Sequence, residues 1–299
     1  MTKDRLELEK FKDIGSEDLD IIENYLKKYK YETCDYNIVN LFSWGHFLNV
    51  RWRMYKDRLL FFNFTSGLML YPLGDPFSAT EMKDLSDMIK NDGYPGNFVS
   101  VPEKYIQDNP SISDHFLPAY DEGNSDYIYL SEHLALLPGK KLHKKKNLVS
   151  QFKRNYTYEI ETFNKKHIEL CAALSIKWCR ETSEMCDDER KLELNVLHRA
   201  MTCSDIIDLK GILILTSGKL AAFSLYSELN ENTADIHFEK YDPDIKGSGQ
   251  IINQETASYL KERYKFINRE QDMGKEGLRK AKLSYEPERI IPSYRFVRK

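Results

Sequence analysis

The sequence predicts an α/β (α+β) protein built from two domains. Its 299 residues are about twice the length of a typical domain. Hydrophobic residues make up 41% of the chain and charged residues 30%, which is enough apolar material for two cores and excludes a largely disordered chain. Alternating runs typical of strands and 3.6-residue patterns typical of helices occur in both halves. We therefore expect a first domain over residues 1–137 and a second over residues 138–299.

The first half opens with a helix and continues into a meander. Ser16–Asp18 can cap a helix that buries Leu19 and Ile22. Alternating or continuously apolar runs separated by turns then predict three antiparallel strands. The elements expected after the first helix are strands over 50–55, 59–64 and 67–71, a helix over 79–90, and short strands over 98–101 and 127–130.

The second half reads as strand, helix, helix, three antiparallel strands, glycine loop, helix and strand. Ser217–Lys219 is the turn of a hairpin between the first two of the three strands. The elements expected are a strand over 156–160, helices through 170–178 and 194–201, strands over 211–215, 220–225 and 234–240, a helix over 250–262, a strand over 265–267, and a polar tail.

Charge is segregated along the chain. The totals of 44 basic and 47 acidic side chains exclude a globally basic polyanion binder. Residues 139–155 nevertheless contain seven lysines and arginines and no carboxylate, directly after an acidic approach to Pro138. Lys144 and Lys145 of this run are candidates for binding phosphates of tRNA or of an anionic lipid surface. A solvated linker or helix face is the alternative.

Several classes of protein are disfavoured. No run of about 18 apolar residues occurs and the first residues are charged, so we expect a cytoplasmic protein without an integral membrane segment. The spacing of the five cysteines matches no familiar zinc signature, and no metal site is predicted. Motifs of serine hydrolases, Walker nucleotide-triphosphatases and zinc proteases are missing from the sequence.

The glycine loop is a candidate cofactor site. Lys246, Gly247, Ser248 and Gly249 open the helix expected over 250–262. Glycines allow backbone N–H groups to approach a phosphate, and a helix N-terminus favours an anion. Asp244 opposes an anion there. The alternative is a tight turn that only starts a helix.

Candidate acid and base residues follow two strands of the second half. On the strand over 234–240, His237 and Glu239 share a face, and a buried Glu or a neutral His can take a proton from an acyl acceptor. Glu270 and Asp272 come directly after the strand over 265–267, and they too are candidate acid/base or amine-binding groups. We assign Asn268 and Arg269 to substrate orientation, and Arg279 and Lys282 to an anionic substrate. A solvent-facing strand, a structural pair between Glu239 and an arginine, and an exposed turn after residue 267 are the alternatives.

A strand that leads into a Gly-x-Gly loop and a helix resembles the core of the GNAT acyltransferase superfamily. A longer set of motifs narrows the resemblance to an uncharacterised bacterial group related to the C-terminal domain of phosphatidylglycerol lysyltransferase. The motifs that carry it are Cys34–Asn37, Asn40–Trp44, Lys141–Asn147, His237–Lys240, Ile267–Gly274 and Gly277–Lys282. The resemblance implies two tandem GNAT-like domains, each with a mixed, mostly antiparallel sheet flanked by helices. It also implies a relation to Fem-type aminoacyltransferases, whose donor is aminoacyl-tRNA.

The predicted function is therefore the transfer of an acyl or aminoacyl group to an amine or hydroxyl. The donor would be acyl-CoA or aminoacyl-tRNA, the acceptor a small or lipid-like molecule, and no tightly bound cofactor is expected. The lipid substrate of the lysyltransferase does not follow from the fold, because the membrane helices that precede its domain have no counterpart in this sequence. The alternative function is a non-catalytic tandem module that binds an anionic ligand or nucleic acid through residues 140–154.

Overall fold

The computed structural model describes residues 6–181 and 188–299 and groups the chain into two compact units. The first unit consists of Met1–Asp126, Gln271–Gly274 and Ile291–Lys299, and the second of Tyr127–Glu270 and Lys275–Ile290. The continuous part of the first unit thus ends at Asp126, and two segments from the C-terminal part of the chain, residues 271–274 and 291–299, also belong to this unit. The division after residue 137 stays a prediction.

The first unit is built on a seven-stranded sheet of order β1-β2-β3-β4-β5-β14-β6. Its strands are β1 Lys12–Asp13, β2 Val50–Tyr55, β3 Arg58–Asn63, β4 Leu68–Leu70, β5 Asn97–Pro102, β6 Phe116–Tyr120 and β14 Ser293–Arg298. The expected meander is confirmed, because β3 pairs antiparallel with both β2 and β4. Its helices are α1 Leu19–Tyr29, α2 Ile38–Phe47, α3 Ala79–Asn91 and α4 Glu103–Asp108.

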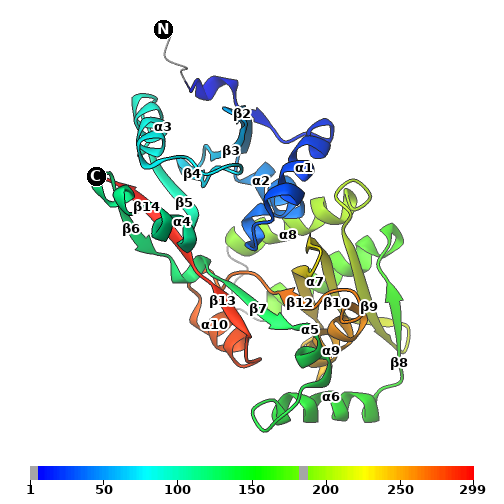
Figure 1. Ribbon diagram of the computed structural model, residues 1–299. Helices are drawn as coiled ribbons and strands as arrows, with labels where there is room; N and C mark the ends of the chain where they lie inside the picture. Colours follow the sequence, from blue (N-terminus) through cyan, green and yellow to red (C-terminus); the bar gives the residue numbers. More distant parts are fainter. Residues whose placement is uncertain (1–5, 182–187) are drawn as a thin grey trace. The chain divides into compact units, whose positions relative to one another are not determined.

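The C-terminal segment is not a polar tail. Strand β14 lies between β5 and β6 and pairs antiparallel with both (Figure 1). Its Phe296 is fully buried and stacks on Phe116 with ring centroids 5.3 Å apart. Arg295 and Arg298 on the same strand are neutralised by ion pairs with Asp121 and Asp87. Because arginines are usually exposed to solvent, the sequence of this inner strand resembles that of a solvated tail.

The second unit is built on a seven-stranded sheet of order β13-β7-β12-β11-β10-β9-β8. Its strands are β7 Asp126–Leu130, β8 Tyr158–Thr162, β9 Lys210–Thr216, β10 Lys219–Asn230, β11 Thr233–Tyr241, β12 Phe266–Asn268 and β13 Arg289–Ile291. The predicted order is confirmed from the strand expected over 156–160 to the strand expected over 265–267. The strand expected over 127–130 is β7, and it pairs antiparallel with β12. Strand β12 is parallel to β11, so both run towards the same edge of the sheet.

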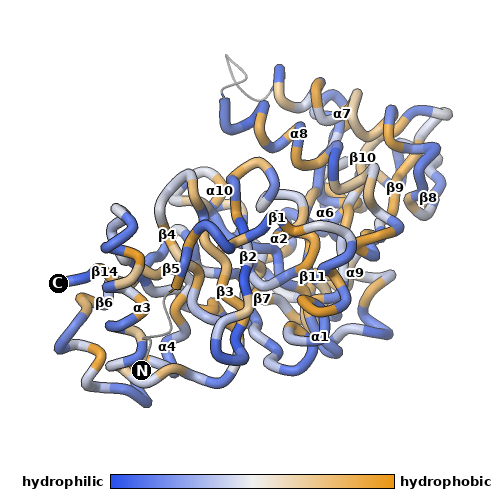
Figure 2. The backbone as a smooth tube through the Cα atoms, turned by 90° about the horizontal axis from the view of Figure 1, so that it is seen from above, coloured by the Kyte–Doolittle hydropathy of each residue, from blue (hydrophilic) through white to orange (hydrophobic). Residues whose placement is uncertain are grey.

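Helices cover both faces of this second sheet. They are α5 Ser131–Leu136, α6 His143–Asn155, α7 Ile168–Glu181, α8 Asp188–Thr202, α9 Ser248–Leu260 and α10 Glu276–Leu283. Helix α9 packs on β9, β10 and β11 and contacts α5 and α6, whereas α7 packs on β10 and β11 and pairs with α8. Seen from above in Figure 2, α7 and α8 lie on one side of β9 and β10, and α9 lies on the other. Most of the basic run over residues 139–155 forms α6, and this helix packs against α9. No helix in the described ranges is long and apolar enough to cross a membrane.

Candidate functional site

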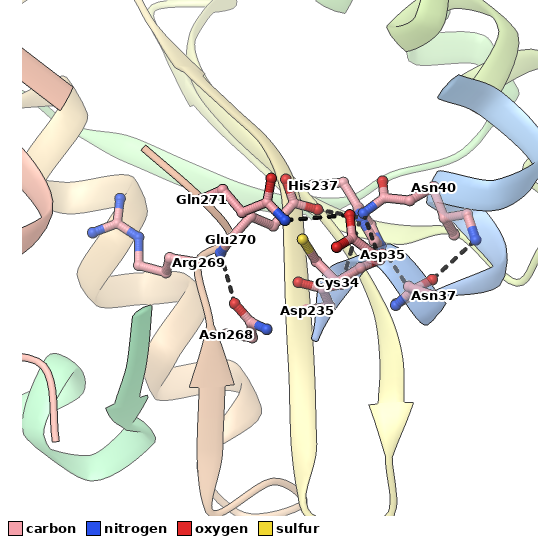
Figure 3. Close-up of polar contacts among 12 residues, drawn as sticks. Cys34, Asp35, Asn37, Asn40, Asp235, His237, Asn268, Arg269, Glu270 and Gln271 are labelled. Carbon is pink, nitrogen blue, oxygen red and sulfur yellow. Dashed lines mark hydrogen bonds and ion pairs between the residues drawn. The ribbon is translucent and has the colours of Figure 1, made fainter. Parts of the chain in front are cut away.

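His237 on β11 is the centre of a buried row of hydrogen-bonding side chains in the second unit. Its Nε2 lies 2.8 Å from Oγ of Ser227 on β10, and its Nδ1 lies 3.0 Å from Oε1 of Glu270. The imidazole is fully buried, whereas the side chain of Glu270 is 20% exposed. Figure 3 shows Glu270 directed at His237 from the end of β12. Glu270 is therefore the outer end of the row and Ser227 the inner end.

The sheet and one tight turn place these groups. In the register between β10 and β11, Ser227 is opposite Asp235, two residues before His237. Glu270 follows Asn268 at the end of β12, and its backbone N–H donates to the Asn268 side chain over 2.7 Å. Glu270 has a φ of 57°, in the left-handed region that few residues other than glycine occupy. Such a conformation persists where the surroundings enforce it, often at functional positions.

Both hydrogen bonds of the His237 ring can form when the imidazole is neutral and carries its proton on Nδ1. The ring then donates to the Glu270 carboxylate and accepts from the Ser227 hydroxyl. A second buried carboxylate, Oδ2 of Asp235, lies 3.9 Å from the same Nδ1. Two carboxylates, those of Glu270 and Asp235, therefore face the same ring nitrogen.

The same three residues have the donor set of a small metal site. Asp235, His237 and Glu270 each offer one ligand atom, and these atoms lie within 4.8 Å of one another. Carboxylate oxygen and imidazole nitrogen are ordinary ligands of divalent transition metals. Because Nδ1 is hydrogen-bonded to Glu270, a metal on that nitrogen would replace the proton between the two side chains.

Glu239, a predicted acid or base, is instead paired with Arg269. The two side chains meet at 2.9 Å and are only 15% and 16% exposed. The guanidinium also lies 5.0 Å from the ring centroid of Tyr285 and 5.8 Å from that of Tyr129. Figure 3 shows Arg269 directed away from His237. The geometry thus favours the structural pair that the sequence left open, and Glu270 rather than Glu239 is the carboxylate on the histidine.

Two of the predicted substrate-binding lysines gather around Arg269. The ammonium of Lys282, a buried residue of α10, donates to the carbonyl oxygen of Arg269. Lys145 of α6 places its Nζ 3.8 Å from the ring centroid of Tyr285. Lys144, its neighbour, is exposed on α6, and Arg279 is partly buried on α10.

Lys145 carries its charge in an unfavourable place. Burial, and after it the positive charge of Arg269, lowers the pKa of the Lys145 ammonium. The unfolded chain therefore binds this proton more tightly than the folded chain does, so the charge destabilises the fold at neutral pH. The penalty fades as the pH rises from the lowered pKa towards that of lysine in the unfolded chain.

Lys145→Met is expected to stabilise the protein. We expect the free energy of unfolding at neutral pH to rise by about 0.5–2 kcal/mol, because the substitution keeps the packing volume and removes the partly buried charge. Urea denaturation measures the change. Lys146→Met, on an exposed position of the same helix, is the control and should leave stability unchanged. A loss of stability in Lys145→Met would show that the charge itself holds α6 in place.

The glycine loop is a tightly packed helix start. Gly247 has a φ of 88°, and a Cβ on it would lie 2.7 Å from the carbonyl oxygen of Leu148 on α6. A Cβ on Gly249 would lie 2.9 Å from the ring of Tyr241. Ser248 donates its backbone N–H to Ile245 and its hydroxyl to the Asp242 carbonyl.

The polar groups beside the loop are also engaged. Lys177 of α7 bridges Asp242 and Asp244, with 2.7 Å to each carboxylate. Asp244, the carboxylate that opposes an anion at the loop, is thus held by a lysine of the same unit. Lys246 is exposed. Both glycines therefore have a packing role that needs no phosphate.

Asp272 lies in the first unit, where it shapes a turn. It is buried, and its carboxylate accepts the backbone N–H of Gly274 over 2.8 Å. The preceding residue, Gln271, donates its side-chain amide to Asp35 of the same unit over 3.2 Å (Figure 3). The structure therefore gives Asp272 a different setting from Glu270, two residues earlier.

Sequence reasoning missed Ser227 and Tyr285 as site residues. Ser227 is on β10, the strand that precedes β11 with His237. Knowledge of the register between these two strands would have indicated that Ser227 lies close to His237. A bulge between Leu225 and Tyr226 shifts that register and hides the pairing from a simple count. Tyr285 lies in the segment read as a tail.

Comparison with known proteins identifies related chains. A family model described as "Phosphatidylglycerol lysyltransferase, C-terminal" matches residues 26–297. A solved conserved protein of unknown function from Bacteroides thetaiotaomicron is 31% identical, covering 97% of this chain and 99% of its own, with a TM-score of 0.89. The structure of L-PGS from Bacillus licheniformis is 16% identical (94% and 91% covered, TM-score 0.65), and FemX is 8% identical (94% and 96% covered, TM-score 0.63). The last two likenesses show a shared fold. The predicted fold class, two mixed sheets flanked by helices, is confirmed.

Proposed function

Because the chain belongs to the phosphatidylglycerol lysyltransferase C-terminal family, as its motifs predicted, we propose that it transfers an aminoacyl or acyl group to an amine or hydroxyl acceptor. The family supports aminoacyl transfer in general. The residues of this chain support a particular place for the chemistry, the outer end of the row formed by Ser227, His237 and Glu270.

The observation that carries the proposal is the partly exposed carboxylate of Glu270 on a buried histidine. In the proposed step, Glu270 takes the proton of the acceptor O–H or N–H as the acceptor attacks the carbonyl carbon of the donor. The bond between that carbon and the leaving oxygen or sulfur then breaks, and the leaving group takes the proton back from Glu270. Protons and electron pairs balance without a further reactant.

His237 and Ser227 position the base in this scheme. The Nδ1–H of His237 fixes one oxygen of Glu270, and Ser227 fixes the tautomer of the ring. A second carboxylate, that of Asp235, lies 3.9 Å from the same Nδ1. Only Glu270 meets the acceptor, so it is the proposed catalytic residue, and the two groups behind it act through it.

The glycine loop favours an aminoacyl ester over acyl-CoA as donor. A pyrophosphate needs open backbone N–H groups at the start of α9, and this start is packed against Leu148 and Tyr241. Asp244 adds a negative charge beside it, although Lys177 compensates that charge. An aminoacyl-tRNA donor needs no such cradle, in agreement with the family.

A donor panel tests the proposal. The full chain is incubated with a set of aminoacyl-tRNAs, or with a set of acyl-CoAs, in the presence of simple amine, alcohol and lipid-like acceptors. We expect consumption of an aminoacyl ester with formation of an aminoacylated acceptor detected by mass spectrometry, and no consumption of acyl-CoA. Folded protein that consumes no donor would overturn the proposal.

A second candidate is the non-catalytic module. Helix α6 exposes Lys144, Lys146 and Arg154, which supports contact with a polyanion. In the same panel, salt-sensitive retention of RNA without consumption of any donor would favour this candidate over the transferase.

A further inference from the structure

We propose that Asp235, His237 and Glu270 bind a divalent transition-metal ion, zinc above all, and that the bound ion prevents Glu270 from acting as a base. The ion site goes beyond the proposed function and stands on geometry. Its inhibitory effect rests on the proposed function, because it requires that Glu270 is the base. All three side chains belong to the second unit, and Figure 3 shows them together. The site contains no cysteine, so the cysteine spacing that disfavoured a metal does not bear on it.

The donor atoms are spaced as a small ion requires. Nδ1 of His237 lies 3.0 Å from Oε1 of Glu270 and 3.9 Å from Oδ2 of Asp235. The donor atoms of all three residues lie within 4.8 Å of one another. Zinc holds nitrogen and oxygen ligands at about 2.0–2.2 Å, so its tetrahedral ligands are about 3.3–3.6 Å apart. Small rotations of these side chains therefore bring three ligands onto one ion, and a fourth position remains open.

The sheet presents these ligands from fixed positions. Asp235 and His237 are two residues apart on β11, and both side chains are fully buried. Glu270 reaches the same place from the end of β12, and its side chain is 20% exposed. An ion can thus enter past Glu270 and meet two ligands that a strand holds in place.

Ser227 supplies the outer contact that a metal-bound histidine needs. A histidine that binds a metal through one ring nitrogen nearly always forms a hydrogen bond through the other. Nε2 of His237 lies 2.8 Å from Oγ of Ser227. When an ion binds Nδ1, the ring proton moves to Nε2 and is donated to this hydroxyl oxygen. The ring therefore stays neutral and keeps its orientation.

The donor set favours zinc over magnesium or calcium. Imidazole nitrogen suits zinc and its neighbours among the transition metals, whereas magnesium and calcium prefer oxygen ligands. In the described part of the chain, a second group of possible ligands, Glu181, Asp242 and Asp244, consists of carboxylates only. The ammonium of Lys177 lies 2.7 Å from both Asp242 and Asp244 and already supplies a positive charge there. We therefore place the ion at His237.

A bound ion would stop the proposed proton transfer. A general base must offer a lone pair to the proton of the acceptor. One carboxylate oxygen of Glu270 would be bound to the ion, and the charge of the ion would lower the affinity of the other oxygen for a proton.

Titration calorimetry with zinc chloride tests the site without any donor present. The sample is the full chain without an affinity tag, and we expect one ion per chain. Asp235→Asn and His237→Gln should each weaken binding by about tenfold or more, and Ser227→Ala by about tenfold, since the loss of an outer contact alone costs about 10–100-fold. Asp244→Asn, from the group held by Lys177, is the matched control and should leave the affinity unchanged. Magnesium chloride at the same concentration should not bind.

X-ray absorption spectroscopy of the one-to-one zinc complex gives an answer that needs no variant. We expect nitrogen and oxygen ligands at about 2.0–2.2 Å, with the scattering of one imidazole. A sulfur ligand at about 2.3 Å would place the zinc on a cysteine and overturn the site. The site is also overturned by a folded chain that binds no zinc, or by equal affinities in Asp235→Asn, His237→Gln and Asp244→Asn.

The inhibition is measured separately, with the donor found in the panel. One equivalent of zinc should lower the rate of the wild-type chain by about tenfold or more, and a chelator should restore it. The same zinc concentration should lower the rate of Asp235→Asn much less, relative to its own rate without zinc. A zinc-bound chain that transfers at the full rate would refute the inhibition. A chain that consumes no donor refutes the transferase proposal, whereas the calorimetry still decides the ion site.

Discussion

Glu270→Gln is expected to lower the rate of transfer by at least about 100-fold, the usual effect of losing a general base. The amide keeps the size of the side chain but cannot accept the acceptor proton. The contact to Nδ1 of His237 can persist through the amide oxygen, so the fold should be retained. The measurement is the initial rate with the donor found in the panel, with circular dichroism to confirm folding.

Glu262→Gln is the matched control for this substitution. Glu262 has a largely exposed side chain in the same unit, after the end of α9, and its charge is removed in the same way. We expect a wild-type rate for it. Ser227→Ala should give an intermediate loss, since it frees the tautomer of His237 and leaves the carboxylate in place. A Glu270→Gln variant with a wild-type rate would remove this carboxylate from the mechanism.

Gly247→Ala is expected to lower the free energy of unfolding by about 2–5 kcal/mol. A Cβ at φ 88° is strained by about 1–2 kcal/mol, and its contact at 2.7 Å with the Leu148 carbonyl forces α6 or the loop to move, which adds about 1–3 kcal/mol. Urea denaturation of the full chain measures the loss. Gly139→Ala separates the two contributions, because Gly139 has a φ of 79° and, among residues 6–181 and 188–299, no atom lies within 4 Å of the added Cβ.

The stabilities of Gly139→Ala and Gly247→Ala together show whether the glycines of the loop serve packing or phosphate binding. Equal losses in Gly139→Ala and Gly247→Ala would mean that the contact with α6 is soft, and that the loop can open towards a phosphate. That result would restore acyl-CoA as a candidate donor. A clearly larger loss at Gly247 supports the packed helix start and a donor without a pyrophosphate cradle.

The elements of the second half could be predicted because their signals are local. The alternation over 234–240 and the turn at Ser217–Lys219 specify a hairpin without knowledge of distant residues. Strand β14 could not be found in this way. Its partners, such as Tyr120 and Val101 opposite Tyr294, lie more than a hundred residues away, and its arginines resemble surface residues until Asp87 and Asp121 are placed beside them.

The candidate site was partly predictable for the same reason. Strand periodicity placed His237 and Glu239 on one face, and the end of β12 marked Glu270. Which carboxylate meets the histidine depends on the left-handed turn at Glu270 and on the pairing of Glu239 with Arg269, and neither is visible in periodicity. Lys145 was predicted as one of a run of lysines. Only the packing of α6 distinguishes it from Lys144.

The path of β14 has a consequence for how the protein is made. The sheet of the first unit has a gap between β5 and β6 until residues 293–298 have been synthesised. The second unit can form its hairpin of β10 and β11 much earlier, although it begins later in the chain. We therefore expect the N-terminal unit to complete its sheet last during translation, with two strand edges waiting for a segment about 170 residues downstream. A ribosome stalled before β14 would hold an N-terminal unit with open edges, the state in which sheets are most exposed to aggregation.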